Sequence, residues 1–299
     1  MDPQAPCKEN TCAAVVTYNP DAGFADRARQ VCRQVAQAVI VDNGSTAGPP
    51  DVGGAHVIAN SDNLGIAAAL NQGLAWARAK GYAWALTLDQ DSCPRDEMVE
   101  HLCHAYAICP YRREVAIVAA NFFDPIARQC FYPTYGTDKL WLEVITAISS
   151  GSLVSLAALA KAGPLREDFF IDSVDNEYCL RLRKLGYRII VSARADMTHV
   201  LGGQRSVYRR HSVRISASDY GPRRRYYMTR NRLVLAAEYA ESQPGWVVRE
   251  LTRAMLEIPA MLLLERWRLS KLAAMGLGVW HAAIGKMGKA DSRLWRQRP

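Results

Sequence analysis

Leu86-Thr87-Leu88-Asp89-Gln90-Asp91 is the stretch around which the chain is organised, because a short apolar run ends there in two carboxylates one residue apart. A buried strand that stops at such a pair sets both acids at the carboxyl edge of its sheet, where open α/β sheets bind ligands. In an extended segment residues i and i+2 point the same way, so Asp89 and Asp91 can address one ligand together. Oxygen ligands suit Mg²⁺ or Mn²⁺, and substrate phosphates commonly complete the shell of Mg²⁺. The alternative is a solvated turn after the strand.

Length and composition indicate a globular protein with one large core. The chain has 299 residues, of which 49% are hydrophobic and 22% are charged, as is ordinary for a globular fold. Its net charge of +8 is uneven, because residues 201–299 hold 19 Lys and Arg against 7 Asp and Glu. The first 200 residues hold 18 against 22. This basic C-terminal region suggests an anionic partner such as a membrane, nucleic acid or phosphates.

The cysteines and the N-terminus predict a cytoplasmic protein. The eight cysteines form no C-x-x-C pair and no Cys/His cluster with zinc-finger spacing, so free thiols are expected. The first ten residues are polar and lack the apolar core of a signal peptide. No stretch reaches about 18 uncharged apolar residues, so no membrane-spanning helix is expected.

The first two thirds of the sequence alternate between strand and helix patterns, which predicts βαβ units and a mostly parallel sheet flanked by helices. The expected strands are about 13–18, 38–41, 57–58, 82–88, 115–120, 144–148 and 187–191. The expected helices are about 21–37, 66–80, 94–109, 156–162 and 176–185. Residues 121–140 have no clear period and are expected to form an irregular hairpin or loop.

From about Asp219 the pattern becomes helical, which divides the chain into a catalytic domain of residues 11–218 and a basic helical extension of residues 219–299. Residues 272–284 contain no Lys, Arg, Asp or Glu, and basic residues and Trp280 lie close by. This composition favours helices lying in an anionic membrane surface at the inner face of the cell membrane. A core helix pair or a homo-oligomer interface is the alternative. Nucleic-acid binding is less favoured, because no known reader motif is present.

Several single motifs have a local structural explanation. Asp42 follows a strand in Val41-Asp42-Asn43-Gly44-Ser45, where it can bind a ribose or base or can form a turn. Asn63-Leu64-Gly65 opens a helix. Thr17-Tyr18-Asn19-Pro20 stands where a dinucleotide-binding protein has its glycine-rich fingerprint, which argues against an NAD site.

In combination these motifs resemble glycosyltransferase family 2 in their order and spacing. The quoted stretches are Val16-Thr17-Tyr18-Asn19, Val41-Asp42-Asn43-Gly44-Ser45, Asn63-Leu64-Gly65 and Asp89-Gln90-Asp91. The Leu-Asp-Gln-Asp-Ser form of the acid pair is similar to the rhamnosyltransferase branch, as are the segments 148–152 and 169–177. The resemblance covers about residues 11–235. It implies the GT-A nucleotide-binding fold and a nucleotide-sugar donor.

The resemblance implies a role for each matching residue. Donor binding falls to Thr17, Tyr18, Asp42, Asn63, Asp89 and Gln90, and metal binding (Mg²⁺ or Mn²⁺) to Asp91 and His199. Arg205, expected in a loop with Arg209 and Arg210, could clamp the diphosphate or form a solvated surface. Asp175 matches the family's catalytic residue at the start of a helix, and a positioned carboxylate there can accept the proton of the acceptor hydroxyl. The alternatives are that Asp175 caps a helix and that Asp172 is the base.

These expectations combine into a metal-dependent, inverting glycosyltransferase. It would transfer L-rhamnose from dTDP-L-rhamnose to a polysaccharide or lipid-linked saccharide acceptor. The alternatives are another donor, UDP-galactofuranose or a UDP-hexose, and a non-catalytic, membrane-associated scaffold of a glycan-assembly complex. The segment Tyr226-Tyr227-Met228-Thr229-Arg230-Asn231 also resembles this family, and its role is open at this level.

Overall fold

A computed structural model describes residues 4–125, 129–132, 139–198, 205–210 and 213–291. The chain forms two compact units, residues 1–166 with 178–200 and residues 167–177 with 201–299. The short segment 167–177 therefore groups with the C-terminal third of the chain, although 23 residues of the first unit follow it in sequence. The division at residues 218 and 219 that the sequence suggests stays a prediction.

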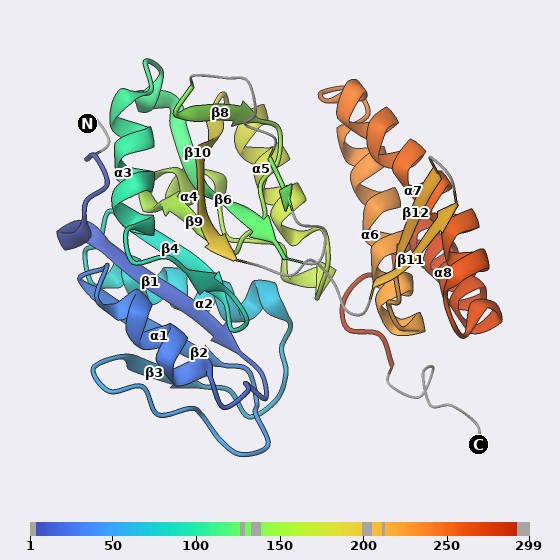
Figure 1. The fold of residues 1–299 in the computed structure, drawn as a ribbon, viewed down its shortest axis with the longest axis horizontal. Coiled ribbons are helices and arrows are strands. Elements are labelled where there is room, and N and C mark those ends of the chain that lie inside the picture. The colour runs from blue at the N-terminus through green and yellow to red at the C-terminus, as the bar shows by residue number, and fades with distance from the viewer. Residues whose placement is uncertain (1–3, 126–128, 133–138, 199–204, 211–212, 292–299) are drawn as a thin grey trace. The chain divides into compact units, whose positions relative to one another are not determined.

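The first unit is built on a ten-stranded sheet (Figure 1). Its strands are β1 Thr11–Thr17, β2 Gln37–Asp42, β3 His56–Ala59, β4 Trp84–Asp89, β5 Cys93–Pro94, β6 Val115–Asp124, β7 Gln129–Cys130, β8 Trp141–Val144, β9 Ser152–Ser155 and β10 Arg188–Thr198. The main path runs β3-β2-β1-β4-β9-β6-β10-β5, with β7 beside β6 and β8 beside β10. The first four strands on this path are parallel, β9 is antiparallel to both of its neighbours, and β6 and β10 are again parallel. The prediction of a mostly parallel sheet is confirmed.

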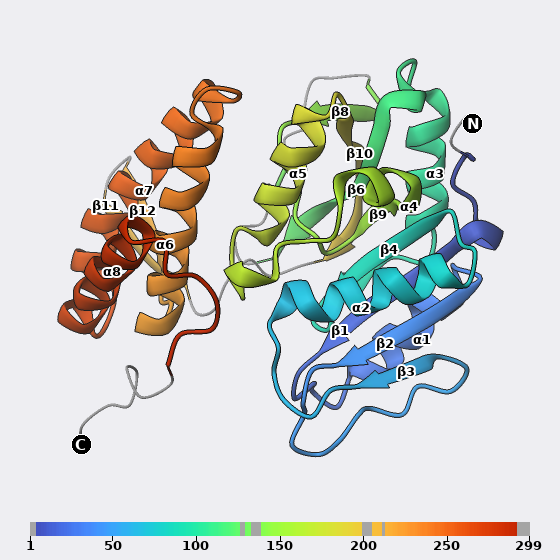
Figure 2. The ribbon, with the colours of Figure 1, turned by 180° about the vertical axis from the view of Figure 1, so that it is seen from behind.

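Helices cover both faces of this sheet, with α1 and α3 on one face and α2 and α4 on the other (Figures 1 and 2). The helices before residue 200 are α1 Phe24–Cys32, α2 Ile66–Ala79, α3 Met98–Ile108, α4 Leu156–Ala162 and α5 Val174–Lys184. Single 3₁₀ turns are η1 Lys8–Asn10, η2 Arg112–Glu114 and η3 Glu167–Phe169. All seven residues of β1 are buried, as expected for a strand covered on both faces. Gly73 lets α2 approach this strand, because a Cβ there would lie 2.9 Å from the Ala14 Cβ.

Two expectations for the strands were wrong. A strand was expected at 144–148, but β8 ends at Val144 and β9 begins at Ser152. The chain turns between them at Gly151, whose φ is +78°. Residues 205–210 were expected to form a loop and instead form strand β11, which pairs antiparallel with β12 Val213–Ser218. The three arginines and the serine of β11 favour a loop when the sequence is read alone.

The second unit contains the β11-β12 hairpin and three helices, α6 Pro222–Tyr239, α7 Pro244–Leu264 and α8 Arg268–Ala283. The helical pattern expected from about residue 219 is confirmed. A buried ion-pair cluster joins the helices: Glu265 accepts from Arg225 at 2.5 Å and from Lys271 at 2.8 Å, and Lys271 also contacts Asp219. Among the described residues, no helix combines the length and the apolarity needed to cross a membrane.

Candidate functional site

The carboxyl ends of β1, β2 and β4 bring most of the predicted donor-binding residues together. The register places Thr17 of β1 beside Asp42 of β2, and Val16 of β1 beside Asp89 of β4. The strand order 3-2-1-4 has its switch point at β1, because the chain runs outward from β1 to β3 and then returns to place β4 on the other side of β1. A crevice at such a switch point is where open α/β sheets bind their ligands.

Asp42 ties the loops after β1 and β2 together. Its side chain is 1% exposed and accepts hydrogen bonds from Thr17 Oγ1 at 2.9 Å, Ser45 Oγ at 2.5 Å and the Ser45 backbone N–H at 3.0 Å. A carboxylate has about four lone-pair sites, so one acceptor position remains for a ligand. In this arrangement Asp42 organises the edge of the sheet.

Asn43 holds the loop that begins with Asn63. Its Nδ2 donates to Asn63 Oδ1 and to the Gly65 carbonyl, both at 3.2 Å, and its Oδ1 accepts from the Leu64 N–H at 3.1 Å. Gly44 is required for this approach, because its φ is +83° and a Cβ would lie 2.7 Å from the Asp62 carbonyl carbon. The two motifs therefore form one structural element, which explains why they occur together in the sequence.

Gln90 joins the loop after β4 to the loop after β1. Its side chain accepts from the Tyr18 N–H at 2.7 Å and donates to the Tyr18 carbonyl at 3.3 Å. Arg27 of α1 donates to the Gln90 carbonyl from Nε and Nη2, at 3.1 and 2.9 Å. The Tyr18 ring is 46% exposed beside this joint, so an aromatic face is open to a ligand.

The segment 148–152 lies against the acid pair. Ser150 Oγ accepts from the Asp89 N–H at 3.0 Å and lies 2.5 Å from the Ser92 Oγ. Thr87 Oγ1 donates to the Ser149 carbonyl at 2.5 Å. The hydroxyl-rich turn thus fixes the backbone from which the side chains of Asp89 and Asp91 project.

Asp91 is the exposed carboxylate at this edge, whereas Asp89 is half-buried. Within the described ranges no three His, Cys, Asp or Glu side chains form a group that could hold a metal. His199, the other predicted metal ligand, lies outside the described residues. An exposed carboxylate is nevertheless compatible with Mg²⁺ or Mn²⁺, because Mg²⁺ is commonly held by one or two carboxylates together with substrate phosphates.

The remaining predicted residues belong to the second unit. Arg205 is the first residue of β11, where its backbone pairs with Ser218. Asp175 lies in the first turn of α5, which begins at Val174, so its interpretation as a cap residue of a helix starting at 176 is wrong. Its side chain is partly exposed, and its Oδ1 accepts from the Asn176 N–H at 2.8 Å.

The segment before Asp175 has an unusual backbone. Phe170, Asp172 and Ser173 have φ values of +65°, +63° and +65°, in the left-handed region that residues with a side chain rarely adopt. Each costs about 1 kcal/mol or more, so the three together cost about 3 kcal/mol. Such strain persists only where surrounding contacts impose it, and it is common at functional sites.

Asp172 is engaged within this segment. Its Oδ1 accepts from Arg224 Nη2 at 3.1 Å, and its side chain is 15% exposed. Burial raises the pKa of Asp172 above its usual value, and the Arg224 guanidinium opposes that shift. Its Oδ2 is buried and has no hydrogen-bond partner among the described residues.

The sequence interpretation missed several residues of these sites. Asn43 and Ser150 stood inside quoted motifs but had no assigned role, and Arg27 gave no signal in the helix pattern. Arg230 and Asn231 belong to the segment whose role was open, and both are fully buried. Their side chains donate to backbone carbonyls of residues 168–172, which overlap the left-handed residues.

Comparison with known proteins gives three kinds of similarity. Residues 12–121 match the model of the family described as Glycosyl transferase family 2. A protein of Shigella flexneri named dTDP-rhamnosyl transferase RfbF is 29% identical over 247 residues, which are 76% of this chain and 79% of that protein.

Two solved structures share the fold. The crystal structure of S. aureus TarS 1-349 superposes with a TM-score of 0.52 at 13% identity, covering 77% of this chain and 65% of that one. The crystal structure of GalNAc-T7 with UDP, GalNAc and Mn²⁺ gives a TM-score of 0.51 at 10% identity, covering 64% and 44%. This chain therefore spans less than two thirds of each of these structures. At such low identity they support the fold alone, which is GT-A-like as expected.

Proposed function

We propose, from the match of residues 12–121 to the model of glycosyl transferase family 2, that the chain is a member of this family and transfers L-rhamnose from dTDP-L-rhamnose to a polysaccharide or lipid-linked saccharide. The observation that carries this proposal is the edge where the loops after β1, β2 and β4 are tied around Asp89-Gln90-Asp91. The rhamnose donor is supported by the name of the Shigella flexneri relative.

The donor nucleotide is assigned to the loops of the first unit. The exposed Tyr18 ring offers a stacking surface for the base, and Asp42, Asn63 and Asp89 supply acceptors and donors for the base and ribose. Gln90 contributes by keeping the Tyr18 loop in place, because its side chain forms two hydrogen bonds with the Tyr18 backbone. Arg205 remains a candidate for the diphosphate.

Asp91 and His199 are proposed to hold Mg²⁺ or Mn²⁺. When bound, such an ion neutralises charge on the diphosphate leaving group. The exposed Asp91 carboxylate, at the end of a buried strand and fixed through Ser92 and Ser150, provides a preorganised ligand for it.

Asp175 is proposed as the base. The acceptor oxygen forms a bond to the anomeric carbon while the bond from that carbon to the diphosphate breaks, which inverts the configuration. The hydroxyl proton passes to the Asp175 carboxylate, and dTDP leaves with the bonding electron pair. Partial exposure and a position in the first turn of α5 make this carboxylate accessible to an acceptor.

The test is transfer with a panel of donors: dTDP-L-rhamnose, dTDP-glucose, UDP-galactofuranose and UDP-glucose, each with Mn²⁺ and with EDTA. We expect release of dTDP from the rhamnose donor only. Turnover of a UDP sugar alone would move the proposal to the alternative donor. Absence of turnover with every donor and a panel of saccharide acceptors would favour the scaffold interpretation.

A matched pair of variants tests the acid pair. Asp91→Asn should lower metal-dependent transfer about a thousandfold, because a metal supplies several kcal/mol of charge stabilisation. Asp96→Asn removes the same charge five residues away, where the side chain accepts a hydrogen bond from Gln30 on the surface. Equal activity of the two variants would rule out the metal role of Asp91.

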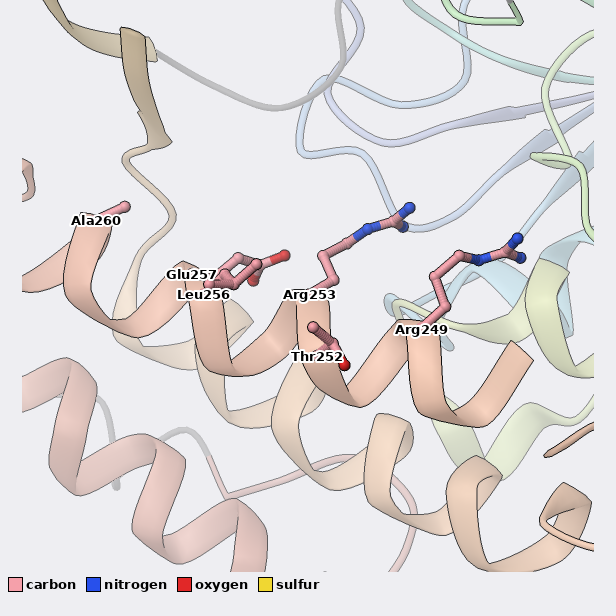
Figure 3. A pocket seen from close by; sticks show the side chains of 6 residues that line it. All are labelled: Arg249, Thr252, Arg253, Leu256, Glu257 and Ala260. Carbon is pink, nitrogen blue, oxygen red and sulfur yellow. The ribbon is translucent and has the colours of Figure 1, made fainter. Parts of the chain in front are cut away.

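The C-terminal helices are proposed to bind an anionic membrane surface. Apolar side chains on α7, on α8 and between them are exposed, among them Leu263, Trp267, Leu269 (82% exposed) and Trp280. A shallow hollow on α7 carries two arginines, Arg249 and Arg253, which extend from the same side of the helix (Figure 3). Exposed apolar and basic side chains together are typical of helices at a lipid interface.

Liposome flotation of the full chain tests this association. The chain should float with vesicles containing phosphatidylglycerol and not with purely zwitterionic vesicles, and the double variant Trp267→Ser/Leu269→Ser should stay in the dense fraction. Leu185→Ser, at an exposed leucine of the first unit, is the control and should float. Unchanged flotation of the double variant would exclude this surface. Concentration-dependent sedimentation of the wild type, lost in the same variant, would indicate a homo-oligomer interface instead.

A further inference from the structure

Arg230 and Asn231 lie one after the other on α6 and are completely buried, yet their polar atoms point to the backbone of a distant segment. Asn231 Nδ2 lies 3.1 Å from the Phe169 carbonyl oxygen, 2.8 Å from that of Ile171 and 2.9 Å from that of Asp172. One amide group therefore donates to three carbonyls of the strained turn.

Arg230 orients this amide and extends the contact. Its Nε donates to Asn231 Oδ1 at 2.9 Å, which leaves Nδ2 to face the carbonyls. Its Nη2 donates to the carbonyls of Phe169 at 3.1 Å and Asp168 at 3.3 Å, and its Nη1 donates to that of Gly288 at 2.8 Å. Among the described residues no carboxylate pairs with Arg230.

Aromatic rings enclose these polar contacts. The guanidinium carbon of Arg230 lies 5.3 Å from the ring centre of Tyr226 and 5.0 Å from that of Tyr227. Phe170, one of the left-handed residues, stacks on Tyr227 at 5.3 Å. The guanidinium charge of Arg230 is thus buried among aromatic rings, where hydrogen bonds are strong and a missing hydrogen-bond partner is costly.

Two further contacts extend the same arrangement along α6. Arg224 donates to Asp172, and Tyr239 at the other end of the helix donates to Glu177 in the first turn of α5 at 3.1 Å. Arg224, Tyr227 and Asn231 are spaced three and four residues apart, so they share one face of the helix. This face of α6 contacts the chain before and after Asp175.

We infer that Arg230 and Asn231 are positioning residues that impose the left-handed backbone of Phe170, Asp172 and Ser173 and thereby set the orientation of Asp175. This inference rests on the proposed transferase function. A buried guanidinium whose partners among the described residues include no carboxylate costs more than an apolar side chain of the same size. Because the Arg230 guanidinium donates to carbonyls of this turn, we assign it the role of holding the geometry of the turn and not of packing alone.

The test uses Asn231→Asp, which keeps the shape and the acceptor for Arg230 Nε but replaces the amide donor with an oxygen facing three carbonyls. We expect kcat to fall about 100-fold, since a displacement of about 1 Å has effects of that size. The KM for the donor should stay within about twofold, because the donor loops belong to the other unit. Hydrogen exchange of the Phe170 and Ile171 amides should accelerate at least tenfold.

Lys271→Met is the matched control, because it breaks a buried ion pair of the same unit without touching the turn. It should lower the melting temperature and leave kcat and the exchange of the Phe170 amide as in the wild type. Wild-type kcat in Asn231→Asp, or equal losses of kcat in both variants, would overturn the inference while leaving the proposed function intact. A wild-type chain that transfers from no donor would remove the proposed function and this inference with it.

Discussion

Replacing Asp42 with asparagine should destabilise the first unit strongly, although the change is isosteric. The carboxylate accepts three hydrogen bonds, from Thr17 Oγ1 and from the hydroxyl and backbone N–H of Ser45. An amide can accept at one oxygen only, so its NH₂ group would face the Ser45 N–H. The change removes one charge-assisted bond, weakens two others and leaves a buried donor unpaired, which sums to about 3 kcal/mol.

This loss corresponds to about a 100-fold shift in the unfolding equilibrium and a fall of about 6–12 °C in the melting temperature. Thermal unfolding followed by near-UV circular dichroism measures it. Thr17→Val removes a single one of the three bonds and should cost about 1 kcal/mol. An Asp42→Asn protein that melts within 2 °C of the wild type would refute the conclusion that this carboxylate organises the donor edge.

Three further outcomes follow from the structure. Gly44→Ala should destabilise the chain by about 2 kcal/mol in urea unfolding, because φ is +83° and the new Cβ would lie 2.7 Å from the Asp62 carbonyl carbon. Burial raises the pKa of Asp172, so its carboxyl group binds a proton more tightly in the folded protein than in the unfolded chain. The free energy of unfolding therefore falls as pH rises from 3.8, the ordinary pKa, through the raised pKa of the folded protein. Asp172→Asn should therefore unfold at higher temperature than the wild type at pH 7 and at the same temperature below pH 3.8. The exposed Cys93 should react with maleimide at pH 8 and be protected several-fold by dTDP with Mn²⁺, whereas Cys103, whose pKa burial raises to about 12, should not react.

The first half of the fold was predictable because its strands and helices differ clearly in hydrophobic periodicity and in composition. β1 is entirely buried, and the alanine-rich α2 ends at Ala79, shortly before Gly81. Both elements therefore stand out in the sequence. β9 was missed because Leu153 and Val154 run directly into the helix formers of α4, which merges a short strand with a helix. Strand β11 was missed because four of its six residues are arginine or serine, a composition that favours an exposed loop.

The candidate donor site could be proposed from the residue types in the sequence, but the contacts between these residues could not. The acids stand at strand ends, where a parallel sheet gathers them, and this follows from the pattern alone. The link between Gln90 and Tyr18 spans 72 residues, and no local periodicity encodes it. The same holds for Asn231, which reaches a turn about 60 residues earlier in the chain.

The two acids that the sequence left as rivals for the base differ in their surroundings. Asp172 has a left-handed backbone, one oxygen on Arg224 and the other buried, so it offers no carboxylate oxygen to an acceptor without rearrangement of the turn. Asp175 lies in the first turn of a regular helix with a partly exposed side chain. A base needs an accessible lone pair in a fixed position, so the partly exposed side chain supports our proposal of Asp175 rather than Asp172. Under the same proposal, the strain of about 3 kcal/mol in the preceding turn serves to position Asp175, and Asp172 is one of the contacts that hold this turn.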